Sequence, residues 1–140
     1  MKDYGSQAVE SDTVEIASSG DVVRARQMVR MLAQRGGLSL VNQTKLVTAA
    51  SELGRNALVY SGGGTARAAV VQDGGRQGVW AEFSDRGPGI PDLGLALTDG
   101  WTSGSGMGLG LSGARRLVDE FDIETELGVG TTVRVLKWAR

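Results

Sequence analysis

The stretch VWAEFSDRGPG, residues 79–89, decides the fold, and its acid is the first candidate for a functional group. Its first seven residues alternate as a half-buried strand does, so every second side chain shares one face. That face carries Val79, Ala81, Phe83 and Asp85. A carboxylate at the inward end of an apolar face needs a hydrogen-bond donor, because burying it unpaired is costly. We therefore expect donors around Asp85, at the end of a strand.

The residues that follow Asp85 are open to two interpretations. An isolated Asp-x-Gly is typical of an acid that caps its own turn. Gly87 and Gly89 also let a flat ring approach the backbone. The carboxylate could then accept a hydrogen bond from an exocyclic amine, such as that of adenine.

Hydrophobic periodicity on either side of this stretch predicts five strands and three helices. The strands are expected over residues 13–17, 66–72, 77–85, 122–126 and 131–138. The helices are expected over residues 22–35, from Ser39 to about Tyr60, and after Gly110, the last with Met107, Leu111, Ala114, Val118 and Phe121 on its buried face. Residues 1–11 are polar and are expected to be flexible, whereas residues 12–140 form one domain. Strands joined by hairpins favour an α+β two-layer sandwich, with a mixed, mostly antiparallel sheet covered by helices on one face.

Composition excludes several classes of protein. The 140 residues are 41% apolar and 22% charged with a net charge of −1, which predicts a soluble globular protein with no nucleic-acid partner. No apolar run approaches the length of a membrane span, so we expect a cytoplasmic protein with no membrane partner. With no histidine and no cysteine, the sequence excludes a Ser-His-Asp triad, a phosphohistidine relay and a thiolate zinc site within this chain.

Glycine is the unusual residue, because 15 of the 22 glycines fall between Gly62 and Gly113. Residues 104–111 read GSGMGLGL and lead directly into the third predicted helix. Alternating glycines let backbone N–H groups converge, and the positive end of the helix favours a polyphosphate. Taken alone, the stretch could also be a flexible loop or allow close helix packing. It lacks the Gly-Lys-Ser/Thr of a Walker loop and the strand context of a Rossmann loop.

The second predicted helix carries two polar residues beside its apolar stripe. The stripe is Leu46, Ala50, Leu53, Ala57 and Tyr60, which must face the core. Glu52 and Asn56 are four residues apart and therefore point the same way. An isolated pair of this kind is usually solvated surface. Beside a nucleotide, Asn56 offers a neutral oxygen to Mg²⁺, and Glu52 could accept the proton of an attacking hydroxyl.

Four motifs in order resemble those of GHKL-type ATP-binding domains. Residues 52–56 (ELGRN) resemble the N box, 85–89 (DRGPG) the G1 box, 104–110 (GSGMGLG) the G2 box and 128–132 (GVGTT) the closing G3 element. The resemblance covers about residues 13–138 and implies the Bergerat α/β sandwich with ATP and Mg²⁺ as cofactors. The implied cofactor-binding residues are Asn56, Asp85, Gly87, Gly89, Gly104, Gly106, Met107, Gly108, Leu109, Gly110 and Thr131. The same resemblance implies that Asn56 holds the metal and that Glu52 is the catalytic base.

Within that family, the chain resembles the small bacterial serine/threonine kinases of anti-sigma and stress signalling. Residues 99–119, with Lys137 and Trp138, look closest to the switch kinases of the stressosome. That resemblance implies phosphorylation of STAS-domain partners and activation of a PP2C-type phosphatase. Two alternatives are an anti-sigma factor kinase that also binds a sigma factor and a non-catalytic binding module gated by nucleotide. Trp101 is a candidate partner anchor, while Arg55, Arg115 and Arg116 could contact either phosphate or partner.

Overall fold

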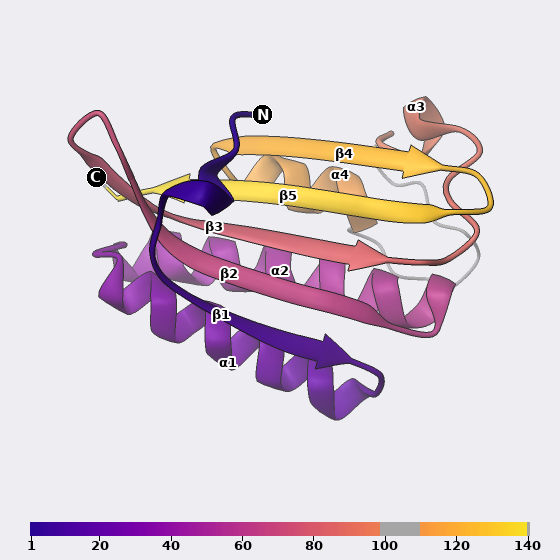
Figure 1. Cartoon of the computed structure of the whole chain (residues 1–140), viewed down its shortest axis with the longest axis horizontal. Helices are drawn as coiled ribbons and strands as arrows, with labels where there is room; N and C mark the ends of the chain where they lie inside the picture. The colour runs from indigo at the N-terminus through magenta and orange to yellow at the C-terminus, as the bar shows by residue number, and fades with distance from the viewer. Residues whose placement is uncertain (99–109, 140) are drawn as a thin grey trace.

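Five strands form one open sheet in the order β1-β2-β3-β5-β4, and every pair of neighbours is antiparallel. The computed structural model describes residues 1–98 and 110–139. Its strands are β1 (Ala8–Ile16), β2 (Gly64–Asp73), β3 (Arg76–Asp85), β4 (Glu120–Glu126) and β5 (Gly130–Trp138). The long helices lie behind the sheet in Figure 1, and its other face, here called the open face, carries the N-terminal segment. The expected α+β two-layer sandwich is confirmed, with pairings in the described chain that are antiparallel throughout rather than mixed.

Two long helices cover the sheet, and both begin and end where local chemistry predicts. In α1 (Ser19–Arg35), the Ser18 side chain accepts a hydrogen bond from the backbone N–H of Asp21. In α2 (Leu40–Ser61), the Ser39 side chain caps the first turn in the same way. Gly62 ends α2 in the left-handed conformation with a φ of 74°, which glycine adopts without steric cost. The main core lies between these helices and the sheet, with Leu32, Leu46, Val79 and Val135 at 0% exposure.

A smaller apolar cluster lies on the other face of the sheet, beneath the N-terminal segment. The cluster consists of Tyr4, Ala69, Val71, Trp80, Leu136 and Trp138. Tyr4 belongs to a short 3-10 helix, η1 (Tyr4–Gln7), and is only 4% exposed. Its ring packs edge-on against that of Trp138, with 5.6 Å between the ring centroids, and its hydroxyl donates to Glu120 Oε2 at 3.1 Å.

The segment expected to be flexible, residues 1–11, has secondary structure from Tyr4 onward. The first strand begins at Ala8 rather than at residue 13, and the segment before it packs on the sheet. Lys2 adds an ion pair to Asp73 at 2.9 Å. The reason is that one aromatic side chain finds an apolar patch formed by β2, β3 and β5. The polar composition of the segment gives no sign of that distant patch.

The third predicted helix also differs from its prediction. α4 spans Gly110–Leu117, so Val118 lies beyond it and Phe121 belongs to β4. Asp119 ends the helical path: its N–H donates to Leu136 O at 2.9 Å, and its Oδ2 accepts from the N–H of Trp138 at 2.7 Å. These bonds to β5 turn the chain into the sheet one helical turn early. An additional short helix, α3 (Leu93–Ala96), is capped by Asp92.

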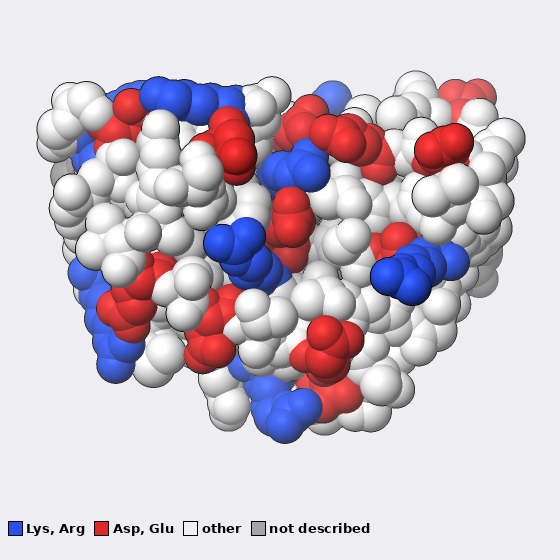
Figure 2. Space-filling model, viewed as in Figure 1, with Lys and Arg blue, Asp and Glu red and all other residues white. Residues whose placement is uncertain are grey.

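Acidic residues occupy both edge strands, β1 and β4. β1 carries Glu10, Asp12 and Glu15, and β4 carries Glu120, Asp122, Glu124 and Glu126 at alternate positions. On the open face Arg134 of β5 bonds Glu82 Oε2 at 2.8 Å, Glu124 Oε1 at 2.9 Å and Asp122 Oδ2 at 3.3 Å. Burial opposes the charge of Arg134, but the hydrogen bonds that it donates to Glu124 and Glu82 outweigh this effect and raise the pKa of Arg134. Figure 2 accordingly shows acidic and basic side chains interspersed on this face.

Candidate nucleotide site

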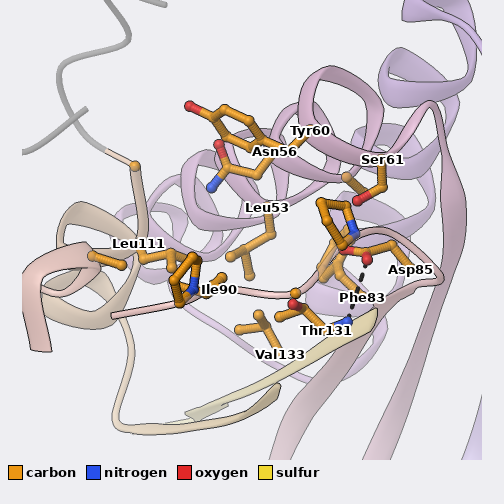
Figure 3. A pocket seen from close by; sticks show the side chains of 16 residues that line it. Leu53, Asn56, Tyr60, Ser61, Phe83, Asp85, Ile90, Leu111, Thr131 and Val133 are labelled. Carbon is orange, nitrogen blue, oxygen red and sulfur yellow. Dashed lines mark hydrogen bonds between the residues drawn. The ribbon is translucent and has the colours of Figure 1, made fainter. Parts of the chain in front are cut away.

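A pocket lies between the C-terminal half of α2 and the ends of β3 and β5. Figure 3 shows Leu53, Phe83, Ile90 and Val133 directed into it. Polar atoms come from Asn56 and Ser61 of α2, Asp85 of β3 and Thr131 of β5. A concave, mostly apolar surface with a few converging polar groups is typical of a small-molecule site. Apolar walls of this kind suit an aromatic ring.

Asp85 is held at one end of this pocket by two backbone donors. Its Oδ1 accepts from the N–H of Gly87 at 2.9 Å and from the N–H of Thr131 at 3.3 Å. Figure 3 marks the second of these bonds. No residue in the described chain donates to Oδ2. The structure therefore combines both interpretations of the sequence, because Asp85 caps its own turn and still offers an acceptor to a ligand amine.

Three glycines at this end of the pocket pack closely against neighbouring parts of the chain. A Cβ built on Gly87 would lie 2.0 Å from Ser61 Oγ, and one on Gly130 would lie 2.1 Å from the carbonyl oxygen of Asp85. Gly89 has a φ of 80° and its Cβ would lie 2.6 Å from the carbonyl oxygen of Glu126. Gly89 lines the pocket. Gly87 is not among the lining residues and packs against Ser61 instead. The structure therefore explains why position 87 requires glycine: the loop packs closely against α2, a contact that the sequence did not suggest.

The other predicted residues of α2 divide into one inside the pocket and one beside it. Asn56 lines the pocket. Glu52 lies one turn earlier and is not part of the pocket wall. Its side chain is 13% exposed, Oε1 lies 3.9 Å from Arg55 Nη1, and Oε2 is buried without a hydrogen-bond partner in the described chain. Arg55 thus contacts the predicted base, a role that the sequence left open.

The remaining predicted residues fall partly outside the described chain. Gly110 and Thr131 line the pocket. Gly104, Gly106, Met107, Gly108 and Leu109, together with Trp101, lie outside the described residues. Sequence reasoning missed Tyr60, Ser61 and Phe83 as pocket residues. The apolar stripe of α2 could have indicated Tyr60, because Leu53, Ala57 and Tyr60 lie on one face of the helix and all three line the pocket.

Magnesium is the metal that the predicted chemistry requires, and the pocket offers one oxygen ligand for it. Residues 1–98 and 110–139 contain no group of three or more acidic side chains that could hold a metal by themselves. Asn56 offers one neutral amide oxygen inside the pocket. Mg²⁺ usually takes few protein ligands and completes its shell with phosphate oxygens and water. This donor set fits an ion that arrives with a nucleotide.

The sheet, the helices behind it and the pocket between them are the arrangement expected of a GHKL-type ATP-binding domain. Comparison with known families places the chain in that class. The profile of the histidine kinase-, DNA gyrase B- and HSP90-like ATPases matches residues 41–139. The chain belongs to this family, so the GHKL resemblance is confirmed. Membership in an ATPase family implies the use of ATP.

A particular relative narrows the class further. The chain is 39% identical over 131 residues to the serine/threonine-protein kinase RsbT of Bacillus subtilis (strain 168), covering 94% of this chain and 98% of that protein. The expectation of a serine/threonine-protein kinase is thereby confirmed. The mycobacterial sensor histidine kinase MprB shares the fold, with a TM-score of 0.56 and 19% identity over 94% of this chain and 99% of that chain. Among the described residues, no helix is long and apolar enough to cross a membrane.

Proposed function

We propose that this chain transfers the γ-phosphoryl group of Mg·ATP to a serine or threonine of a STAS-domain partner and thereby switches on a PP2C-type phosphatase. The observation that carries the nucleotide part is the unpaired Oδ2 of Asp85 at the end of an apolar pocket. The similarity to RsbT supports the choice of a kinase and of stress signalling. A cytoplasmic location is part of the same proposal.

The base of ATP would lie between α2 and the sheet. Leu53 and Phe83 provide apolar surface there, and Asp85 Oδ2 would accept a hydrogen bond from the exocyclic amine. A carboxylate accepts but does not donate, so it favours an amine over a carbonyl at that position of the purine. The pocket thus supports adenine as the base.

The phosphates would extend from the base toward Asn56 and the start of α4. Gly110 lines this side of the pocket, and the proposed phosphate-binding backbone is that of residues 106–110. The Asn56 amide oxygen would hold Mg²⁺, which neutralises phosphate charge when bound. Catalysis by such a site depends mainly on positioning and electrostatic stabilisation.

Glu52 is the proposed base for the transfer. As the partner's hydroxyl oxygen attacks the γ-phosphorus, the bond to the β,γ-bridging oxygen breaks and ADP leaves with its electrons. The hydroxyl proton passes to the Glu52 carboxylate. An unpaired, buried Oε2 has the acceptor capacity for this proton, and the chain contains no histidine to take it instead.

The direct test is Glu52→Gln, which keeps the size of the side chain and removes the base. We expect ATP affinity to be retained and single-turnover phosphotransfer to a STAS protein to fall by roughly 10²-fold or more. Glu10→Gln is the matched control, because Glu10 lies on the exposed edge strand β1. Unchanged transfer by Glu52→Gln would refute the assignment of the base.

The same assay separates the two alternatives. Nucleotide-dependent binding of the STAS protein by the wild-type chain, with no transfer of label, would indicate a nucleotide-gated binding module. A sigma factor bound by the purified chain would indicate an anti-sigma factor kinase. Transfer to the STAS protein followed by release and phosphatase activation supports the switch kinase.

A further inference from the structure

Ser61 is the last residue of α2 and lines the same pocket as Asp85. Figure 3 shows the Ser61 side chain and the Asp85 carboxylate on the same side of the pocket, with Ser61 coming from the helix and Asp85 from the sheet. The helix ends here because Gly62 takes the left-handed conformation. Ser61 is therefore held at a fixed point opposite the end of β3.

Close packing fixes Ser61 against the loop that follows Asp85. A Cβ on Gly87 would lie 2.0 Å from Ser61 Oγ, 2.6 Å from Ser61 Cβ and 3.2 Å from Asp85 Oδ1. One small volume beside Gly87 thus touches the serine hydroxyl and the carboxylate together. The two polar groups are neighbours although they are 24 positions apart in the sequence.

Both groups have hydrogen-bonding capacity that the described chain does not use. The Ser61 hydroxyl has no hydrogen-bond partner in the described residues, and neither does Asp85 Oδ2. Asp85 Oδ1, by contrast, is already occupied by two N–H donors. A hydroxyl can donate, whereas a carboxylate only accepts. The pocket therefore presents one donor beside one acceptor at its polar end.

We propose that Ser61 is a second base-recognition residue of the ATP site, an inference that rests on the proposed nucleotide function. The Ser61 hydroxyl donates to the purine ring nitrogen next to the amine, while Asp85 Oδ2 accepts from that amine. This donor and acceptor pair matches the edge of a 6-aminopurine. A 6-oxopurine presents a carbonyl oxygen to Asp85 Oδ2, so two acceptors would face each other, whereas its ring N–H could donate to the serine hydroxyl. Asp85 therefore discriminates against the 6-oxopurine, and Ser61 adds affinity for the 6-aminopurine.

The test removes the hydroxyl from the protein and the ring nitrogen from the ligand, separately and together. Calorimetry would measure the affinities of the wild type and of Ser61→Ala for ADP and for 1-deaza-ADP, in which that nitrogen is replaced by CH. We expect Ser61→Ala to weaken ADP binding about five- to tenfold and to leave 1-deaza-ADP binding unchanged, since one hydrogen bond is at stake. A structural role of Ser61 would weaken both ligands equally.

Ser84→Ala is the matched control for loss of a serine hydroxyl near Asp85. Ser84 precedes Asp85 on β3, and its hydroxyl is paired with Thr132 Oγ1 at 3.0 Å. This variant should bind both ligands as the wild type does, and thermal unfolding would confirm that each variant is folded. Equal loss for both ligands, or no loss for ADP, would overturn the role of Ser61. A wild-type chain that binds neither ligand would instead overturn the proposed nucleotide function.

Discussion

Gly87→Ala tests the tight packing between the end of α2 and the loop after β3. The added methyl carbon would lie 2.0 Å from Ser61 Oγ and 2.6 Å from Ser61 Cβ. The hydroxyl can rotate away, but Ser61 Cβ is fixed to the helix. Reaching a normal carbon–carbon contact requires the loop to move by about 1 Å. Overpacking of this kind costs about 1–3 kcal/mol of the free energy of unfolding.

A second substitution at position 61 shows whether this contact is the cause. Ser61→Gly removes both clashing atoms, whereas Ser61→Ala leaves the Cβ at 2.6 Å. Urea unfolding should therefore show that Gly87→Ala costs much less in the Ser61→Gly background, while most of its cost persists in the Ser61→Ala background.

Gly94→Ala is the control for a glycine replaced by alanine without a clash. Its added Cβ would meet only Asp92 Oδ1 within 4 Å, at 3.5 Å. An equal cost of Gly87→Ala in all three backgrounds would refute the packing argument. So would wild-type stability of Gly87→Ala itself.

Three further predictions concern Asp85, Tyr4 and Asp21. Asp85→Asn should weaken ADP binding about tenfold or more, because an acceptor-only group becomes an amide, and unchanged affinity in calorimetry would contradict the assignment. Tyr4→Ala should cost about 3 kcal/mol of unfolding free energy and Tyr4→Phe only about 1 kcal/mol, as measured in urea; no loss for the alanine variant would mean that the N-terminal segment is detached. Burial and the hydrogen bond to Glu120 raise the pKa of Tyr4. The stability that depends on its neutral hydroxyl should therefore be complete below pH 10 and be lost as the pH rises through the folded-state pKa. The hydrogen bond from the backbone N–H of Ala17 lowers the pKa of Asp21, so Asp21→Asn should lower the melting temperature at pH 7, and the difference should shrink as the pH falls through the folded-state pKa of Asp21; a difference that does not change with pH would refute it.

Local features of the fold were predictable from the sequence because their causes lie within a few residues. Ser39 caps the helix that it was expected to begin, Ser18 caps α1 in the same way, and Gly62 ends α2. The turn at Gly74 and Gly75 takes positive φ values of 59° and 84°, which match a two-residue hairpin. Asp85 was predictable for the same reason, since alternation along β3 sets the face on which it lies.

Features that depend on distant contacts were not predictable in this way. Tyr4 is ordered by an apolar patch whose residues come from three strands, and α4 ends early because Asp119 bonds β5. Ser61 precedes three glycines and was not predicted as a site residue, but the fold places it in the same pocket as Asp85. The hydrophobic pattern of one segment carries no information about which segment will face it. Pairing of the sheet supplies that information.

The acids on the two edge strands have a consequence for solubility. A nine-residue edge such as β1 exposes unpaired N–H and C=O groups that could join the sheet of another molecule. At neutral pH the carboxylates of β1 and β4 repel the same strands of a second copy. Neutral side chains at these positions would remove this repulsion. The edge-strand acids therefore protect the folded protein from joining its sheet to that of a second copy, and replacing those of β1 with amides should promote such assembly.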